Sequence, residues 1–132
     1  MSAVVGERIV HKSFPSITRH RLALYCGASG DHNPIHVDLD FAKEAGFPDV
    51  FSHGMLVMGY LGQALTDAVA PSRIRSFSTR FVAITKLGAT LTCEGTVIEL
   101  IEHNGEKRAR IALTTKDETG EIKLAGEAII AL

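Results

Sequence analysis

An aspartate and a histidine lie five residues apart in a short segment that cannot form a regular helix. The segment, residues 29–36, reads SGDHNPIH, and its glycine and proline interrupt helical hydrogen bonding. Histidine titrates near neutral pH, so His36 is suited to general acid–base catalysis. A neighbouring carboxylate such as that of Asp31 can orient the imidazole or a shared water molecule. The two residues are therefore a candidate pair for moving a proton to or from water.

A glycine at the start of the most apolar segment supplies the second half of a candidate site. Gly54 directly precedes the apolar run that begins at Met55, so we expect it in the first turn of a helix. The first N–H groups of a helix are unpaired and carry a partial positive charge. Such a donor can contribute about 3 kcal/mol to the stabilisation of a developing oxyanion. Addition of water to an enoyl thioester requires both an activated water and a stabilised enolate oxygen.

Helices are expected in the first half of the chain, where they must position these groups. Thr18 can cap a helix that runs to about Cys26 and stops at Gly27. The pattern also predicts a short strand over residues 7–13, an irregular segment over 27–35, a short helix over 41–45 begun by Asp38 or Asp40 and ended by Gly46, and a main helix from Ser52 or His53 to just before Pro71.

Alternating apolar residues predict strands in the second half. The alternation covers residues 77–83, 91–97, 109–115 and 122–130, with turns at 103–106 and 118–120. The Asn104-Gly105 pair favours a tight hairpin. A long apolar helix beside a curved antiparallel sheet is expected to lie in its concave face. We therefore predict an α+β fold and a single domain over residues 1–132.

The bulk composition excludes several classes of function. The chain has 132 residues and a net charge of −1, which provides no electrostatic footprint for nucleic acid. The longest apolar run, Met55 to Leu61, is far too short to span a membrane. Cys26 and Cys93 are far apart and form no CxxC motif, which favours reduced thiols. No signal peptide precedes Glu7, so we expect a cytoplasmic location.

The histidines show no spacing typical of a metal site. His32 and His36 are four residues apart, but Pro34 lies between them and argues against a helical zinc pair. We therefore expect no metal ion.

Residues 25–38, which read YCGASGDHNPIHVD, together with Ala42, Gly46-Phe47 and the SHGM of residues 52–55, resemble the MaoC-like dehydratase family. This family includes the (R)-specific enoyl-CoA hydratases and the (3R)-hydroxyacyl-ACP dehydratases. The resemblance implies a hot-dog fold, in which an antiparallel sheet wraps around a long central helix. It also implies a homodimer or paired half-domains, and no metal or prosthetic group. CoA or the pantetheine arm of an acyl carrier protein would be part of the substrate.

The resemblance also assigns roles to individual residues. Asp31 and His36 would be the catalytic pair, the Gly54 amide would bind the oxyanion, and Asn33 would support the loop. The acyl thioester would enter between protomers, with its tail along the central helix. His53 is expected to hold the loop by hydrogen bonds, or else to touch the thioester, and Met55 to line the core or the acyl tunnel. Ser52 stands where the family usually has Ala, and we interpret it as a helix cap.

The expected activity is reversible hydration of trans-2-enoyl thioesters to (R)-3-hydroxyacyl thioesters. In our preferred assignment His36 takes the proton of water while Asp31 orients the water and carries the proton to Cα, but the two roles can be exchanged. One alternative is the catalytic subunit of a heterodimeric 3-hydroxyacyl-ACP dehydratase. Others are a non-catalytic acyl-thioester-binding or dimer-partner subunit, which would not need both Asp31 and His36, and a thioesterase. The sequence does not determine the length of the acyl chain, whether the acyl group is carried by CoA or by a carrier protein, or the physiological direction of the reaction.

Overall fold

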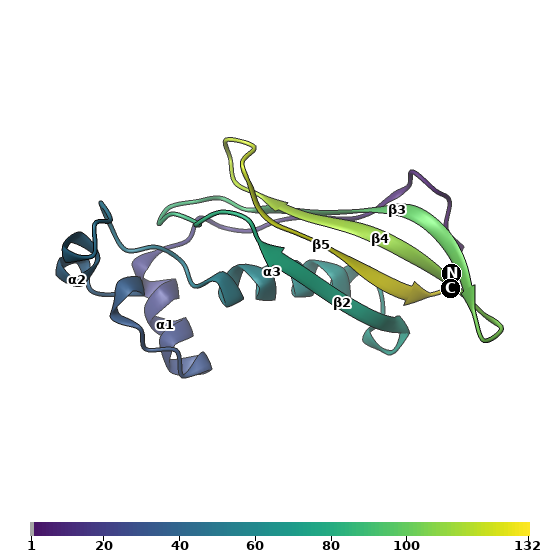
Figure 1. Cartoon of the computed structure of the whole chain (residues 1–132), viewed down its shortest axis with the longest axis horizontal. Coiled ribbons are helices and arrows are strands. Elements are labelled where there is room, and N and C mark those ends of the chain that lie inside the picture. The colour runs from purple at the N-terminus through teal and green to yellow at the C-terminus, as the bar shows by residue number, and fades with distance from the viewer. Residues whose placement is uncertain (1) are drawn as a thin grey trace.

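One antiparallel sheet bends around a long helix in the computed structural model, which describes residues 2–132 (Figure 1). Its five strands are arranged in the order β1-β3-β4-β5-β2, so that β1 and β2 form the two edges. The strands are β1 (Arg8–Ser13), β2 (Ile74–Phe81), β3 (Thr92–His103), β4 (Glu106–Lys116) and β5 (Ile122–Ala131). The helices are α1 (Arg19–Ser29), α2 (Leu39–Glu44) and α3 (Gly54–Ala68), with short 3-10 turns η1 (Pro34–His36) and η2 (Pro71–Arg73).

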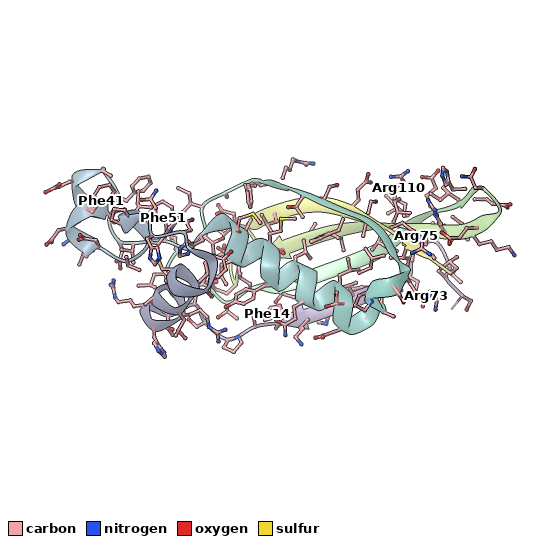
Figure 2. The ribbon with its side chains drawn as sticks, turned by 90° about the horizontal axis from the view of Figure 1, so that it is seen from below. Phe14, Phe41, Phe51, Arg73, Arg75 and Arg110 are labelled. Atoms are coloured by element: carbon pink, nitrogen blue, oxygen red, sulfur yellow. The ribbon has the colours of Figure 1, made fainter. Side chains whose placement is uncertain are left out.

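The core lies between α3 and the sheet. Helix α3 crosses the face of the sheet (Figure 2) and contacts β1, β3, β4 and β5. The helix buries Leu56, Val57, Tyr60, Leu61, Ala64 and Leu65. On the facing side of the sheet, alternate residues of the strands are buried, among them Cys93, Val97, Ile111, Leu113, Leu124 and Ile130. These residues belong to the predicted inward faces, and the predicted α+β hot-dog architecture is confirmed.

The two smaller helices lie at one end of the sheet, beside the start of α3 (Figure 1). Thr18 caps α1 as predicted, because its side chain accepts a hydrogen bond from the amide of Arg21. Asp38 likewise caps α2 through the amide of Phe41. Among residues 2–132, no helix is both long and apolar enough to cross a lipid bilayer.

The end of α1 and the role of Ser52 differ from the sequence prediction, whereas α3 begins at one of the two predicted residues. Helix α1 continues past Gly27 and ends at Gly30, which has the left-handed conformation (φ 77°) and donates its N–H to the carbonyl of Cys26. Gly30 rather than Gly27 is therefore the C-terminal stop. At the start of α3 the N-cap position is His53, and its side chain makes no capping hydrogen bond. Ser52 was expected to cap α3, but its hydroxyl instead donates to the carbonyl of His53.

Candidate active site

Side-chain hydrogen bonds to the backbone fix the loop between α1 and α2. The Ser29 hydroxyl donates to the carbonyl of Tyr25 at 2.6 Å and accepts the amide of Asp31 at 3.1 Å. The Asp31 carboxylate accepts the amide of Asn33 at 3.2 Å. The Asn33 side chain in turn accepts the amide of Ile35 at 3.1 Å and so caps η1. Each polar residue of the motif therefore holds the next, and Asn33 occupies the loop-supporting position that the resemblance implies.

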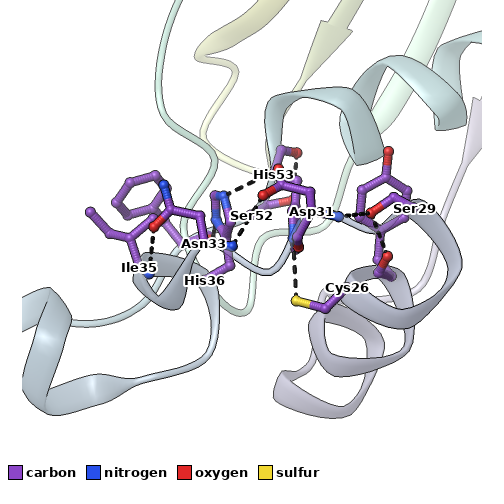
Figure 3. Close-up of polar contacts among 10 residues, drawn as sticks. Cys26, Ser29, Asp31, Asn33, Ile35, His36, Ser52 and His53 are labelled. Carbon is purple, nitrogen blue, oxygen red and sulfur yellow. Dashed lines mark hydrogen bonds and ion pairs between the residues drawn. The ribbon is translucent and has the colours of Figure 1, made fainter.

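His36 is buried at the end of this loop, and its environment selects one tautomer. The imidazole Nδ1 lies 2.8 Å from the carbonyl oxygen of Phe51, which can only accept a hydrogen bond. Nδ1 therefore carries the proton, and in the neutral ring Nε2 presents a lone pair. Nε2 lies 4.0 Å from Oδ2 of Asp31 (Figure 3). The neutral imidazole and the carboxylate are thus two acceptors that can share the two O–H groups of one water.

The two partners differ in their exposure to solvent. The side chain of His36 is 10% exposed, whereas that of Asp31 is 50% exposed. The carboxylate is therefore open to bulk water, while the imidazole is held by the protein. This combination allows water to reach the pair while the acceptor nitrogen stays fixed.

His53 stacks against the ring of His36 and is hydrogen-bonded to the loop between α1 and α2. The ring centroids are 3.8 Å apart with an interplanar angle of 26°. Nε2 of His53 donates to the carbonyl of Asp31 at 3.3 Å and lies 3.5 Å from Sγ of Cys26. Burial lowers the pKa of His53, and the nearby His36 lowers it further. His53 therefore stays neutral near pH 7 and is placed to hold the loop.

Ligand atoms of Asp31, His36 and His53 lie within 4.8 Å of one another, close enough to consider a metal site. Their geometry favours hydrogen bonding instead. Stacked rings direct their nitrogen lone pairs along nearly parallel planes rather than toward one point. In addition, Nε2 of His53 already donates to the Asp31 carbonyl, so that nitrogen has no lone pair to offer.

The first turn of α3 opens into a pocket of about 310 Å³ that also contains His36. Gly54 is the first helical residue, so its N–H has no partner within the helix. A β-carbon at Gly54 would lie 2.9 Å from Cε1 of Phe81, so a larger residue here would require this ring or the helix tip to shift. The lining residues are His36, Phe51, Ser52, Gly54, Val57, the segment 81–85, Lys123 and Leu124. The pocket thus combines a hydrogen-bond acceptor, a free helix-tip amide and apolar walls.

The remaining candidates from the sequence lie around this pocket rather than in its lining. Asp31 reaches His36 from the solvent side. Asn33 lies in the loop between α1 and α2, and His53, the N-cap residue of α3, hydrogen-bonds to that loop. Met55 is largely exposed. The arrangement therefore brings Asp31, His36 and Gly54 together and leaves Met55 at the surface.

Three further residues shape the site, and motif reasoning missed all of them. Phe51 orients His36 through its carbonyl, a role that any residue type can fill and that no sequence pattern marks. Phe81 packs on Gly54 from the edge strand β2. Lys123 lines the pocket although it stands in an alternating strand, where a lysine ordinarily faces solvent.

Comparison with known proteins identifies the family. A model of the MaoC like domain matches residues 2–120. The (R)-specific enoyl-CoA hydratase of Rhodospirillum rubrum is 32% identical over 117 residues, which cover 87% of this chain and 79% of that protein. The peroxisomal enoyl-CoA hydratase 2 of Arabidopsis thaliana is 38% identical over 80 residues, or 58% of this chain. That match spans only 26% of the length of the plant protein.

A solved structure gives the same result. The unliganded R-hydratase PhaJ1 from Pseudomonas aeruginosa superposes with a TM-score of 0.83 at 30% identity, covering 97% of this chain and 81% of that chain. The family resemblance that the SGDHNPIH segment suggested therefore extends over nearly the whole sequence. The chain belongs to the MaoC-like dehydratase family.

Proposed function

We propose that the protein is a hydro-lyase that reversibly hydrates trans-2-enoyl thioesters to (R)-3-hydroxyacyl thioesters. The observation that carries this proposal is that the His36 imidazole and the Gly54 amide line one pocket, with the Asp31 carboxylate 4.0 Å from His36. Water activation and oxyanion binding are thus available at one place. The names of the relatives, enoyl-CoA hydratases, support the same reaction class.

In the hydration direction, one water donates its two hydrogens to Nε2 of His36 and to the Asp31 carboxylate. Its oxygen lone pair then faces Cβ of the enoyl group, and the C–O bond forms as His36 takes one proton. The Gly54 amide stabilises the negative charge that develops on the thioester oxygen. His36 then returns its proton to the hydroxyl oxygen just bonded to Cβ, and the hydrogen of that hydroxyl passes to Asp31, because the two side chains are 4.0 Å apart and cannot exchange it directly. Asp31 delivers its proton to Cα. The site's side chains and a backbone amide supply all of these steps without a metal or prosthetic group.

The alternative functions differ in what they demand of this site. A non-catalytic binding subunit has no need of a fixed imidazole tautomer facing a solvent-exposed carboxylate. A thioesterase attacks the carbonyl carbon and releases a free thiol. The catalytic subunit of a heterodimeric dehydratase would run the same chemistry on a carrier-protein substrate, and so differs only in the carrier and the partner.

A spectroscopic assay tests the activity. Purified protein mixed with crotonyl-CoA should remove the ultraviolet absorbance of the conjugated enoyl thioester without releasing free thiol. A parallel reaction with crotonyl-ACP separates the two carriers. Thiol release at the rate of absorbance loss would identify a thioesterase, and no change in either signal would contradict the proposal.

Two variants test the catalytic pair. Asp31→Asn and His36→Ala should each lower kcat by a factor of at least about 100, because each removes one acceptor for the reacting water. Asp31→Asn keeps the side-chain oxygen that holds the Asn33 amide, so the loop should stay intact. The matched controls are Asp38→Asn, which retains the α2 cap, and His32→Ala, an exposed neighbour. Near-normal turnover in either test variant would defeat the assignment.

We also propose that two copies of the chain associate and that the acyl thioester enters between them. Strand β2 is an edge of the sheet with a free side, and an apolar group stands exposed at its end. This group consists of Phe81, Val82 and Ile84, together with Met55, which follows the glycine that Phe81 packs against, and we call it the β2 patch. Exposed apolar surface beside an unpaired strand edge favours association with another chain.

A further inference from the structure

Lys123 is a buried lysine at the mouth of the candidate site. Its side chain is only 2% exposed, which is unusual for an ammonium group. It is buried because β5 bulges at this point: Thr115 pairs with Leu124 and Lys116 pairs with Ile122, so Lys123 is the extra residue. A bulge turns a side chain out of the regular alternation. Both Lys123 and Leu124 consequently face inward.

Three acceptors satisfy the ammonium group of Lys123. It donates to the carbonyl of Ile84 at 2.9 Å, lies 3.3 Å from Oδ2 of Asp117, and also binds the carboxylate of Glu121. Lysine has three N–H donors, so none is left over for a substrate. The two carboxylates compensate the charge, and the third bond fastens the backbone of Ile84. The arrangement is therefore built to hold the protein itself.

The backbone of Lys123 also hydrogen-bonds to the segment 82–84. Its carbonyl accepts the amides of Val82 at 2.9 Å and Ala83 at 3.4 Å. Together with the ammonium contact to Ile84, these bonds attach three successive residues of the pocket wall to one residue of β5. Residues 82–84 lie outside the regular strands, since β2 ends at Phe81 and the next strand begins at Thr92.

The segment that Lys123 holds is connected to the candidate catalytic groups. The carbonyl of Thr85 accepts the amide of Ser52 at 2.9 Å, and Lys86 forms a β-bridge with Phe51. Phe51 in turn accepts Nδ1–H of His36. Ser52 stands two residues before Gly54, at the tip of α3. A continuous path of short contacts thus runs from the buried ammonium to both the imidazole and the helix-tip amide.

We propose that Lys123 is a positioning residue for the hydration site: it anchors the segment 82–86, which in turn holds Phe51 and so keeps His36 in its Nδ1–H tautomer. The inference rests on the function proposed above. Misplacement of catalytic groups by about 1 Å can lower a rate about 100-fold, so a remote anchor can matter for turnover. A lysine that only stabilised the fold would leave the tautomer of His36 unchanged in any variant that remains folded.

The test replaces Lys123 with Met, which keeps an unbranched apolar stem of similar length and removes only the hydrogen bonds of the ammonium group. Lys123→Met should lower kcat for crotonyl-CoA by a factor of about 10 to 100 and change KM less. Nitrogen-15 NMR of the imidazoles should show a single Nδ1–H tautomer for His36 in the wild type and a mixture in the variant. The matched control is Lys107→Met, an exposed lysine on β4 outside the pocket, which should behave as the wild type.

A second variant covers the case in which Lys123→Met does not fold. Glu121 is 59% exposed, so Glu121→Ala weakens the anchoring of the ammonium without disturbing the core. It should reduce kcat to a smaller extent and change the His36 signals in the same sense. Wild-type kcat and tautomer in Glu121→Ala, or in a folded Lys123→Met, would overturn the inference. A wild-type protein without hydratase activity would instead refute the proposed function. The tautomer measurement would still test whether Lys123 positions His36.

Discussion

The two stacked histidines have opposite tautomers, and each is set by one backbone carbonyl. His36 donates from Nδ1 to Phe51 and leaves Nε2 free, whereas His53 donates from Nε2 to Asp31 and leaves Nδ1 buried without a partner among the described residues. A proton added to Nδ1 of His53 would find no acceptor and would lie close to the His36 ring. Both effects favour the neutral form of His53. The stack therefore keeps one imidazole inert beneath the one that we propose to be reactive.

The depressed pKa of His53 predicts a specific loss of stability in acid. Because the folded-state pKa lies below the ordinary value of 6.5, the unfolded chain binds a proton more readily than the folded one. The stabilising contribution is thus present above pH 6.5 and is lost as the pH falls below it. His53→Gln keeps a donor in the position of Nε2 and cannot titrate.

Melting temperatures measured between pH 8 and pH 5 should therefore fall less steeply for His53→Gln than for the wild type. His32→Ala, which removes an exposed histidine, provides the control slope. Parallel curves for the wild type and His53→Gln would show that His53 titrates alike in the folded and unfolded states.

The sequence predicted Asp31 and His36 as a candidate pair, and the structure places them 4.0 Å apart, but the sequence could not distinguish donor from acceptor. The spacing of the motif and its resemblance to the MaoC-like family were sufficient to name the pair. The tautomer of His36 depends on the carbonyl of Phe51, fifteen residues further along the chain, and a backbone carbonyl has no sequence signature. The burial of Lys123 was equally hidden, because it depends on a bulge and on the segment 82–84 folding over β5.

At the scale of elements, α3 begins with a glycine in close contact with an aromatic ring. Its first amide is available because the side chain of His53 does not cap the helix. The ring of Phe81 occupies the place where a side chain at position 54 would begin. Phe81 is itself 56% exposed, so its ring can move when a neighbour demands space. The tip of α3 is thus open to substrate on one side and bounded by β2 on the other.

This packing predicts a recoverable defect. Gly54→Ala places a methyl group against Phe81 and shifts either the ring or the helix tip, so kcat for crotonyl-CoA should fall by a factor of about 10 or more. Phe81→Ala removes the obstacle, so Gly54→Ala should lower kcat by a smaller factor in the Phe81→Ala background than in the wild type. A double-mutant cycle measures this coupling. Wild-type kcat in Gly54→Ala would show that the position of the helix tip does not affect turnover.

Local signals predicted most elements, and the errors have a common origin. Thr18, Asp38 and the Asn104-Gly105 turn act through neighbouring backbone groups, and each lies where the sequence placed it. Gly27 failed as a helix stop because glycine permits a left-handed residue without requiring one. Gly30 adopts that conformation where the chain must turn into the loop of the motif. Which glycine ends a helix is therefore decided by tertiary structure.

On the scale of the whole molecule, the two ends have different chemistry. Phe41 and Phe51 lie at the end that carries the site, whereas Arg73, Arg75 and Arg110 lie at the opposite end (Figure 2). Those arginines are already engaged within the chain: Arg73 donates to the carbonyl of Ala131, Arg75 pairs with Glu106, and Arg110 bridges Glu99 and Glu127. Arg75 lowers the pKa of Glu106 to about 2, with Arg108 adding to the effect. This end of the sheet is therefore held by ion pairs, while the site end exposes the apolar β2 patch.

The β2 patch is the surface along which two copies of the chain would associate. If two copies meet along β2 as we propose, Val82 passes from half exposed to buried in an apolar interface. Val82→Glu would then place an unpaired carboxylate there, and the cost of desolvating it should exceed what the interface can supply. Light scattering after size-exclusion chromatography should give the mass of two chains for the wild type and of one for Val82→Glu. Leu24→Glu, at an equally exposed apolar position on α1, should remain a dimer. A dimeric Val82→Glu would move the interface away from β2, and a monomeric wild type would exclude a stable dimer.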